Sequence, residues 1–514
     1  MSRFSNNPKA RAQSVPVATT VNNAGGAAYS KTAELELVNL LYSSFLSKTA
    51  YETEDEIVKR ITTLCAQIED KSFVAKAALY ARNELGMRSV SHLVAGEIAS
   101  KGYASGTSWG RTFFDAIVHR VDDMAEIMGY FLANDHKALP NSLKAGFASA
   151  FDRFDAYQLA KYRGESQAVK LIDVVRLVRP KATAKNAEAL TALVKGELRA
   201  TKTWETKLSA AGQATASEKV QAKADVWKDL LAANQLGYIA LMRNITNIAV
   251  GADDNTFALA LTKLLDKAAM SKALVMPFQL YLAAKEVESN SSIPAGRRAK
   301  VVDTLSAAVD LSLVNVPSLP GRTLVCVDNS GSMSSGVSTF GRTCAIDIAT
   351  LFGVVLAKAS ANADLVIFND TAAFVPVMKS RSVLDTTRVL AQTTGGTAFE
   401  SIFRLLNAKE VPEAYDRILV LSDMQSWVGS TGGPFASMVK AYRAKTQKPN
   451  MSFVSWDLTG TTSMQVPQDD ARTIVLGGWS DKIFDILTQT EQDRNALVNA
   501  VKAYAIKVPS KTRE

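Results

Sequence analysis

The sequence predicts a multidomain fold, in which an all-α half built from stacked helical pairs is followed by an α/β doubly wound domain. The chain has 514 residues, which is more than one hydrophobic core normally serves. Residues 32–318 carry apolar residues at three- and four-residue intervals and almost no strand-type alternation. From residue 319 onward, apolar β-branched runs alternate with amphipathic helical stretches, which is typical of a parallel sheet covered by helices.

The composition restricts the class of protein. No apolar run approaches the roughly 18 residues that a membrane helix needs. Residues 1–31 are rich in Ser, Asn, Ala and Gly, so we expect a flexible N-terminal arm rather than a secretory signal. The three cysteines, Cys65, Cys326 and Cys344, show no metal-type spacing. These features predict a cytoplasmic protein in a reducing compartment.

The charge is distributed unevenly. The net charge is +9, and residues 1–318 hold 39 basic against 32 acidic residues. A polyanion such as a nucleic acid is therefore a candidate partner of the helical half, although many proteins carry a similar excess for solubility alone.

The helical half reads as helices of about 10–18 residues separated by short breaks. The breaks carry helix-ending residues such as Gly86, Pro140, Pro180 and Gly251. So many successive helices cannot surround one bundle core, but stacked pairs can each bury an apolar face on the next. No strict repeat period is visible, so the repeats are expected to be degenerate.

The second half begins after a linker marked by Pro317 and Pro320. Its predicted strands are Thr323–Asp328, Asp364–Asn369, Arg417–Ser422, Ser452–Trp456 and Thr473–Leu476. Its predicted helices are Arg342–Ala359, Phe399–Leu406, Phe435–Arg443, Asp481–Leu487 and Gln492–Ile506. In such sheets, ligands bind outside the carboxyl ends of the strands.

Oxygen-bearing side chains gather at those strand ends. In "LVCVDNSGSMSSG" the first strand ends in Asp328, followed by Ser330 and Ser332. Thr397 lies in "TTGGTAFE", on a loop before a helix, and Asp423 ends the strand in "RILVLSDMQS". Carboxylate and hydroxyl oxygens are ligands for a hard divalent cation, most simply Mg²⁺. The alternative for Asp328 and Ser330 is helix capping, but it leaves Thr397 and Asp423 unexplained.

These five positions resemble the metal-ion-dependent adhesion site of von Willebrand factor A domains, over roughly residues 322–506. The resemblance implies a Rossmann-like domain that binds a protein partner through the metal. No histidine lies in residues 319–514 and no second metal cluster is evident, so the sequence does not favour an enzyme.

The helical half also resembles a known family. The stretches that carry the resemblance are "AALYARNELGMRSVSHLVAGEIA", "LAKYRGESQAVKLIDVVRLVRPKA", "WKDLLAANQLGYIALMRNITNIA" and "VMPFQLYLAAKEV". Together with the adhesion-type domain they are similar to the TROVE module of the Ro autoantigen proteins and their bacterial relatives. The resemblance covers the chain beyond about residue 30.

That resemblance implies a monomeric ring of HEAT-like repeats, residues 32–318, whose ends are bridged by the von Willebrand domain, residues 319–514. It also implies a small noncoding Y-like RNA on a basic outer surface and single-stranded 3′ ends of misfolded RNA in a central hole. An exoribonuclease tethered through the noncoding RNA is a further implied partner, and no membrane partner is expected.

Residues 153–185 carry eight basic residues against three acidic ones, which favours sequence-tolerant binding of phosphates. Tyr162 lies between two of them and could stack on a base. The candidate RNA-binding residues are Arg82, Arg88, Lys161, Tyr162, Arg163, Lys170, Arg176, Arg179, Lys181, Lys185 and Arg243.

Each of these residues also has a structural alternative. Asp173 and Arg176 are three apart and could pair with each other on a helix, and Arg243 could hold adjacent repeats together. At the level of function, the alternative to an RNA-binding protein is an adaptor that works through the Mg²⁺ site with the helices as scaffold. A metal-dependent nuclease is the least supported of the three.

Overall fold

The structure of the protein is a computed structural model of the whole chain. It describes residues 18–43, 52–133, 138–162, 168–199, 204–213, 218–316, 318–336, 343–408, 413–427, 434–466, 472–478, 487 and 495–508.

The first half of the chain is helical, as the periodicity predicts. Its helices are α1 (Ala33–Ser43), α2 (Glu54–Gln67), α3 (Lys71–Asn83), α4 (Ser89–Ser100), α5 (Gly110–Ala116), α6 (Val121–Ala133), α7 (Asn141–Ala150), α8 (Ala156–Lys161), α9 (Leu171–Val178), α10 (Ala187–Lys195), α11 (Trp204–Ala211), α12 (Lys219–Ala232), α13 (Tyr238–Gly251), α14 (Asp254–Leu264), α15 (Lys267–Lys272), α16 (Pro277–Ser289) and α17 (Ala295–Ser312). Near neighbours along the chain pack on each other, as in α5 on α7, α4 on α6 and α16 on α17.

Several helices begin at side chains that accept their first free N–H groups. Thr53 and Glu56 form a capping box at α2, and Asp70 accepts the N–H groups of Ser72 and Phe73 at α3. Asp253 caps α14 in the same way. The short polar breaks of the sequence are therefore helix starts, and they leave the apolar stripes free to pack.

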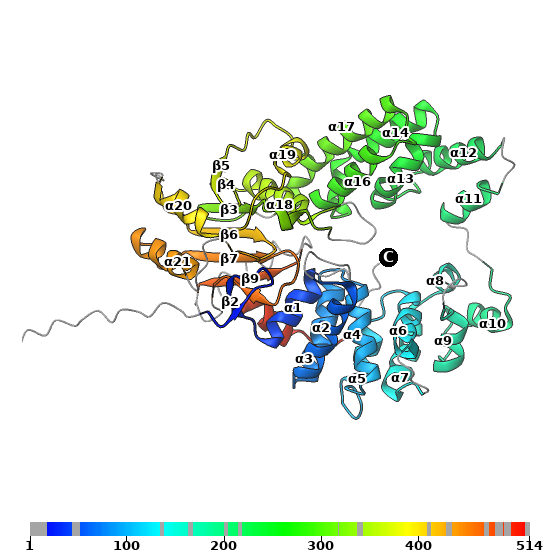
Figure 1. Ribbon diagram of the computed structural model, residues 1–514. Helices are drawn as coiled ribbons and strands as arrows, with labels where there is room; N and C mark the ends of the chain where they lie inside the picture. The colour runs from blue at the N-terminus through cyan, green and yellow to red at the C-terminus, as the bar shows by residue number, and fades with distance from the viewer. Residues whose placement is uncertain are drawn as a thin grey trace, which may run out of the picture.

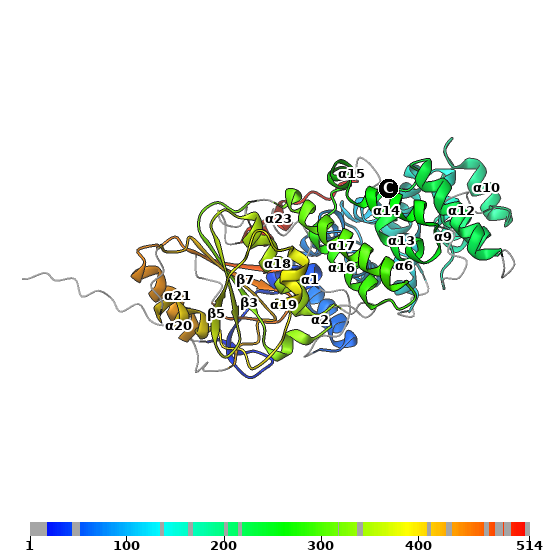
Figure 2. The same ribbon diagram turned by 90° about the horizontal axis from the view of Figure 1, so that it is seen from above.

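The helices follow a ring-shaped path (Figure 1). Helices α1–α10 lead away from the sheet along one side, and α11–α17 return along the other. Both ends of the path contact the second half of the chain, α1 at its strands and α16 and α17 at its helices. Figure 2, seen from above, shows the sheet at one end of the molecule and the helical path extending from it. The predicted fold class is confirmed.

The second half contains a six-stranded sheet with the order β5-β4-β3-β6-β7-β9. Its strands are β3 (Thr323–Asp328), β4 (Ala363–Phe368), β5 (Ala372–Val375), β6 (Arg417–Ser422), β7 (Ser452–Asp457) and β9 (Thr473–Gly477). The helices are α18 (Ala345–Ala359), α19 (Val383–Leu390), α20 (Glu400–Ala408), α21 (Pro434–Lys445) and α23 (Ala496–Ala503). All strands are parallel except β5, which pairs with β4 in the antiparallel direction.

The five predicted strands agree with the structure to within one residue at either end. Edge strand β5 and helix α19 were not predicted, because both are short and lack a long apolar run. The predicted helix at residues 481–487 lies almost wholly outside the described residues. Among the described helices, none is long and apolar enough to cross a membrane.

The N-terminal segment differs from the expected arm. Residues 18–31 are ordered: β1 (Thr20–Val21) pairs with β2 (Ala27–Ser30), and β2 pairs with β8 (Ser463–Met464) of the second half. The polar composition suggested a loose segment because its partners lie more than 400 residues away in sequence. Residues 1–17 of the expected arm lie outside the described residues.

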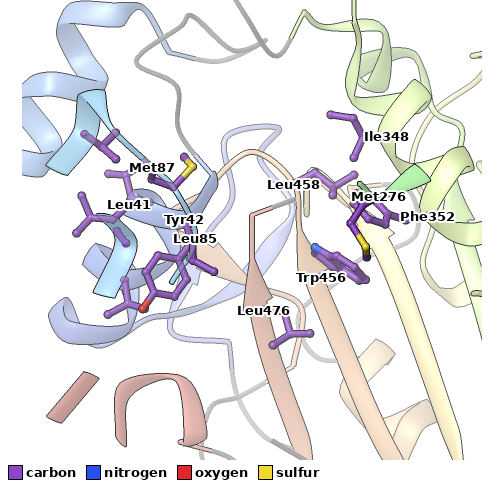
Figure 3. Close-up of a cluster of buried hydrophobic side chains, with 14 of the residues drawn as sticks. Leu41, Tyr42, Leu85, Met87, Met276, Ile348, Phe352, Trp456, Leu458 and Leu476 are labelled. Atoms are coloured by element: carbon purple, nitrogen blue, oxygen red, sulfur yellow. The ribbon is translucent and has the colours of Figure 1, made fainter. Parts of the chain in front are cut away.

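The hydrophobic core runs without a break from the helical half into the sheet. Figure 3 shows Leu41 and Tyr42 of α1 on one side of strands β7 and β9, and Phe352 of α18 on the other. Trp456 of β7 lies between them and contacts Phe352, with ring centroids 5.2 Å apart. The sheet is therefore the common support of both ends of the helical path.

Candidate functional site

Asp328 occupies the carboxyl end of the central strand β3. All six residues of this strand are buried, and Asp328 is fully inaccessible. Its Oδ1 accepts the N–H of Ser330 at 2.9 Å, and its Oδ2 accepts the hydroxyl of Ser422 at 2.5 Å. Ser422 ends the neighbouring strand β6, so two parallel strand ends hold one carboxylate.

The loop after β3 carries the two serines. The Oγ atoms of Ser330 and Ser332 are 3.3 Å apart. This loop is joined to the one that carries Thr397, because the N–H of Gly331 donates to the carbonyl of Gly395 at 3.1 Å. Gly395 has φ +71°, and a Cβ there would lie 2.5 Å from Asp370 Oδ2, so the approach requires glycine.

Asp423 follows β6 directly and is buried. Parallel pairing places Leu421 opposite Val327, which brings the ends of β6 and β3 to the same edge of the sheet. The next residue, Met424, has φ +61°, a left-handed conformation that turns the chain sharply after the carboxylate. Asp423 Oδ1 accepts the N–H of Gln425 at 3.3 Å, whereas its Oδ2 is buried without a hydrogen-bond partner.

The two carboxylates are electrostatically unusual. Burial raises the pKa of Asp328, although the bonds from Ser422 and Ser330 act against it. Burial also raises the pKa of Asp423, and the nearby charge of Asp328 raises it further, while the Ser332 hydroxyl lowers it. Within the described part of the chain, no Lys or Arg forms an ion pair with either carboxylate.

The structure thus gathers Asp328, Ser330, Ser332, Thr397 and Asp423 at one edge of the sheet. Two buried acids that form no ion pair among the described residues, one of them with an oxygen that has no hydrogen-bond partner there, fit a divalent cation. These five residues could hold it. Asp328 and Asp423 would supply the negative charge, and the hydroxyls the remaining oxygen ligands.

Sequence reasoning missed the third aspartate at this edge. Asp457 ends β7, and its Oδ2 receives the Lys31 ammonium at 2.8 Å with both side chains fully buried. The aspartate at the end of "SFVSWD" was a visible signal. Its cationic partner was not, because Lys31 lies 426 residues earlier in the chain.

The basic residues around α9 lie at the surface of the protein. Helix α9 buries Leu171, Val174, Val175 and Val178 and presents its polar face to solvent. Asp173 accepts the N–H of Lys170 at 3.0 Å, and no ion pair between Asp173 and Arg176 is present in the structure. Five exposed residues, here called the basic patch, form no ion pair in the described part of the chain: Lys170, Arg176, Arg179, Lys181 and Lys185.

Arg82 and Arg88 differ from the expectation of phosphate-binding residues. Arg82 is only 9% exposed and donates to Asp123 at 2.9 Å. Arg88 donates to Asp123 and Asp122, each at 2.9 Å, and pairs with Glu126. Their charges are already neutralised between α3, α4 and α6, so both are structural residues. These ion pairs could not be predicted from the sequence, because the acidic partners lie 34–41 residues away along the chain.

Tyr162 and its neighbours have a mixed outcome. Tyr162 is half-buried, and the Arg120 guanidinium lies 4.5 Å from its ring centroid. A base could stack there only after Arg120 moves, so the structure does not favour the predicted stacking. Lys161 is exposed and lies 5.6 Å from the same ring, while Arg163 lies outside the described residues.

Arg243 is exposed on α13, away from the basic patch in the chain. It lines a groove of about 220 Å³ between α13 and α16, together with Thr246, Gln279 and Glu286. A larger cavity of about 800 Å³ continues from Thr246 toward α12 and includes Lys219, Lys223 and Asn247. Sequence reasoning did not single out Lys219 and Lys223, because their stretch is polar and alanine-rich and reads as a surface helix.

Comparisons with known proteins cover nearly the whole chain. The TROVE domain family matches residues 26–196 and 195–304, and the Ro60 vWA domain family matches residues 322–490. The crystal structure of the Deinococcus radiodurans RO (RSR) protein matches with a TM-score of 0.59 and 16% identity. The match covers 92% of this chain and 100% of that chain, and it shows a shared fold.

Curated relatives match a shorter region. The chain is 28% identical over 138 residues to telomerase protein component 1 of Mus musculus, and 30% identical over 139 residues to that of Rattus norvegicus. Each match covers 25% of this chain and 5% of the relative, so the chain spans a small fraction of those relatives' length.

Proposed function

The chain belongs to the TROVE domain family, which implies an RNA-binding ribonucleoprotein component, and from that premise we propose how it works. It binds a small noncoding Y-like RNA on the basic patch and accepts the single-stranded 3′ ends of misfolded RNA within the ring-shaped path. It acts in RNA quality control by holding RNA, not by cleaving it. An exoribonuclease is recruited through the noncoding RNA.

The observation that carries this proposal is the basic patch. Five exposed cations lie within 16 residues of chain, from Lys170 to Lys185, and none forms an ion pair in the part of the chain that the structure describes. Elsewhere, buried or half-buried arginines such as Arg82, Arg88 and Arg153 are neutralised by aspartates. Cations left unpaired at a surface are free to replace the counterions of phosphates.

The test measures RNA binding as a function of salt. A structured RNA with a single-stranded 3′ tail should bind with an affinity that falls steeply between 50 and 200 mM salt, as expected for several phosphate contacts. Replacing Lys181 and Lys185 by Gln should weaken binding about tenfold and reduce the magnitude of the salt slope by about 2. Lys300→Gln, at an exposed lysine of α17, is the matched control. A flat salt response of the unaltered protein contradicts the proposal.

We also propose that the five oxygen-bearing residues bind a divalent cation, most simply Mg²⁺. The proposal is supported by the unpartnered Oδ2 of Asp423 and by the burial of Asp328 beside it. Titration with Mn²⁺, followed by electron paramagnetic resonance, should show one site that Asp423→Asn abolishes. If the unaltered protein does not bind Mn²⁺, the cation site is absent.

A second candidate function follows from the same carboxylates. If the cation keeps a coordination position for an acidic side chain, the second half works as a protein-interaction module beside the RNA-binding ring. Asp328→Ala would then leave RNA affinity unchanged while removing cation binding. A parallel loss of RNA affinity in a folded variant would instead tie the cation to RNA binding.

A further inference from the structure

The N-terminal hairpin, residues 19–30, lies against the loop that carries Asp423. Asn22 is 3% exposed, and its Nδ2 donates to the carbonyl of Ser426 at 2.7 Å. Its Oδ1 accepts the N–H groups of Ala24 and Gly26 at 3.1 and 2.8 Å. One buried amide therefore shapes the hairpin and attaches it to the Asp423 loop.

The contact is fitted closely. A Cβ on Gly26 would lie 2.1 Å from the carbonyl oxygen of Ser426, so only glycine allows the hairpin to approach this far. Gly25 before it has φ +84° and supplies the turn. The two glycines of the hairpin therefore permit this close packing against the loop.

Ser426 in turn joins two of the loops that carry the candidate cation ligands. Its Oγ donates to the carbonyl of Thr397 at 3.2 Å and accepts the N–H of Phe399, also at 3.2 Å. The N–H of Trp427 donates to the same carbonyl of Thr397 at 3.1 Å. The position of Ser426 therefore sets how the Thr397 loop and the Asp423 loop lie relative to each other.

Strand β8, which pairs with β2 of the hairpin, leads into a second contact with the loop that carries Asp423. Pairing of β2 with β8 places Gln465 immediately after the strand, and its Nε2 donates to the carbonyl of Met424 at 2.7 Å. Met424 is the residue with positive φ that follows Asp423. Two carbonyls of the loop thus accept hydrogen bonds, one from the hairpin and one from the residue after the strand that pairs with it.

We propose that the N-terminal hairpin is a positioning element for the cation site, and that cation binding and hairpin docking stabilise each other. The inference rests on the cation site proposed above. Among the described residues, no hydrogen bond joins the hairpin to any of the five ligands; it acts through Ser426, and through Met424 by way of Gln465 after β8. The hairpin continues directly into α1. Cation binding is therefore also coupled to the packing of α1, the first helix of the ring-shaped path. By thermodynamic reciprocity, each event must strengthen the other by the same factor.

The first experiment uses the full chain without substitution. Amide hydrogen exchange of residues 19–30 is measured without a divalent cation and with saturating Mg²⁺. Exchange at Asn22 and Gly26 should slow by about tenfold with Mg²⁺, because opening of the hairpin would then cost the coupling free energy as well. Equal exchange in the two conditions, in a protein shown to bind Mn²⁺, overturns the proposal.

The second experiment measures the reverse coupling. Asn22→Ala should weaken Mn²⁺ binding about tenfold, as loss of a supporting contact behind metal ligands commonly does. Thr20→Ala, at a half-buried residue of the same hairpin, should bind Mn²⁺ as the unaltered protein does. Unchanged affinity in Asn22→Ala removes the coupling but leaves the cation site standing, whereas failure of the unaltered protein to bind Mn²⁺ removes both.

Discussion

The ring-shaped path meets the sheet-containing half at two junctions, and the two are built from different contacts. At the first junction, α1 lies against β9 and the loops that follow β7 and β9, where three glycines allow a close approach. At the second, α16 and α17 lie against α18 and α19, and partly exposed charged side chains make several of the polar contacts. The close fit of α1 and the partly exposed ion pairs of α16 and α17 differ in how they respond to salt.

Three glycines form the seat of α1 at the first junction. A Cβ on Gly460 would lie 2.4 Å from Ser43 Oγ, one on Gly477 would lie 2.9 Å from the backbone of Asn39, and one on Gly478 would lie 2.1 Å from the carbonyl of Tyr42. A side chain at any of these three positions would therefore collide with α1. Beside these glycines, Lys31 and Asp457 form a buried ion pair that joins the two halves of the chain.

Asp347 at the start of α18 is the centre of the second junction. It accepts the hydroxyl of Tyr281 at 2.9 Å and the ammonium of Lys285 at 2.6 Å, both from α16. Asp310 of α17 receives Lys358 and the N–H of Val383. The Lys285 and Asp310 side chains are 28% and 36% exposed, so these bonds compete with water and salt.

The contrast has a consequence for the ring. Exposed ion pairs contribute little and weaken with salt, whereas a close backbone fit responds to neither salt nor small changes of pH. The polar contacts of the second junction should therefore be the more sensitive to salt. The predictions below compare the two junctions, in order of decreasing effect.

Lys31→Met should destabilise the protein most, by about 3 to 5 kcal/mol, because it leaves the carboxylate of Asp457 buried without its cation. Urea denaturation measures the loss. The double variant with Asp457→Asn should recover part of it, since the uncompensated charge is then gone. A loss below about 1 kcal/mol in Lys31→Met would show that the backbone N–H groups that donate to Asp457 stabilise its buried carboxylate without Lys31.

Gly478→Ala should destabilise by about 3 kcal/mol, through the clash with Tyr42 and the strain of a side chain at φ +94°. Gly86→Ala is the matched control, since Gly86 has φ +71° but open space around its Cβ. That control should lose only about 1 kcal/mol by thermal denaturation. Equal losses in the two variants would mean that the close fit to α1 contributes nothing beyond backbone conformation.

Lys285→Met repeats the lysine substitution at the second junction. It should cost about 1 kcal/mol, because the pair is partly exposed and Asp347 keeps the hydroxyl of Tyr281 and the N–H of Cys344. The same urea titration applies as for Lys31→Met. A loss as large as that of Lys31→Met would remove the distinction between the two junctions.

Salt should have the smallest effect. Raising NaCl from about 0.1 to 1 M shortens the Debye length from about 10 to 3 Å. Exchange of the Val383 amide, bonded to Asp310 at 3.1 Å, should quicken a few-fold. The Gly460 amide, bonded to buried Asp457 at 2.8 Å, should not change. Equal changes at both amides would contradict the comparison.

Much of the second half could be predicted from sequence, because its signals are local. The run Thr323–Asp328 reads as a buried strand, and parallel pairing brings the carboxyl ends of the parallel strands to one edge of the sheet. Asp423 could therefore be assigned beside Asp328 without a structure. Thr397 lies on the loop before α20, so its place beside them was predicted from the motif and not from a strand end.

The helical half was predictable as a class but not in its contacts. Apolar periodicity gives helices and the side of each that is buried, which explains the exposed face of α9 with Arg176. It does not give the partner of a charged residue on another helix. Arg82 and Arg88 were misassigned for that reason, since only the packing of α3, α4 and α6 brings the aspartates to them.

Local patterns, then, were enough for the helices, the parallel strands, the placement of Asp328 and Asp423 at one edge of the sheet, and the surplus of exposed basic residues. Tertiary structure alone decided that Lys31 neutralises Asp457, that Asn22 supports the Asp423 loop, and which arginines remain free. The reason is that side-chain periodicity is a property of neighbouring residues. Burial and ion pairing are properties of surfaces brought together from distant parts of the chain.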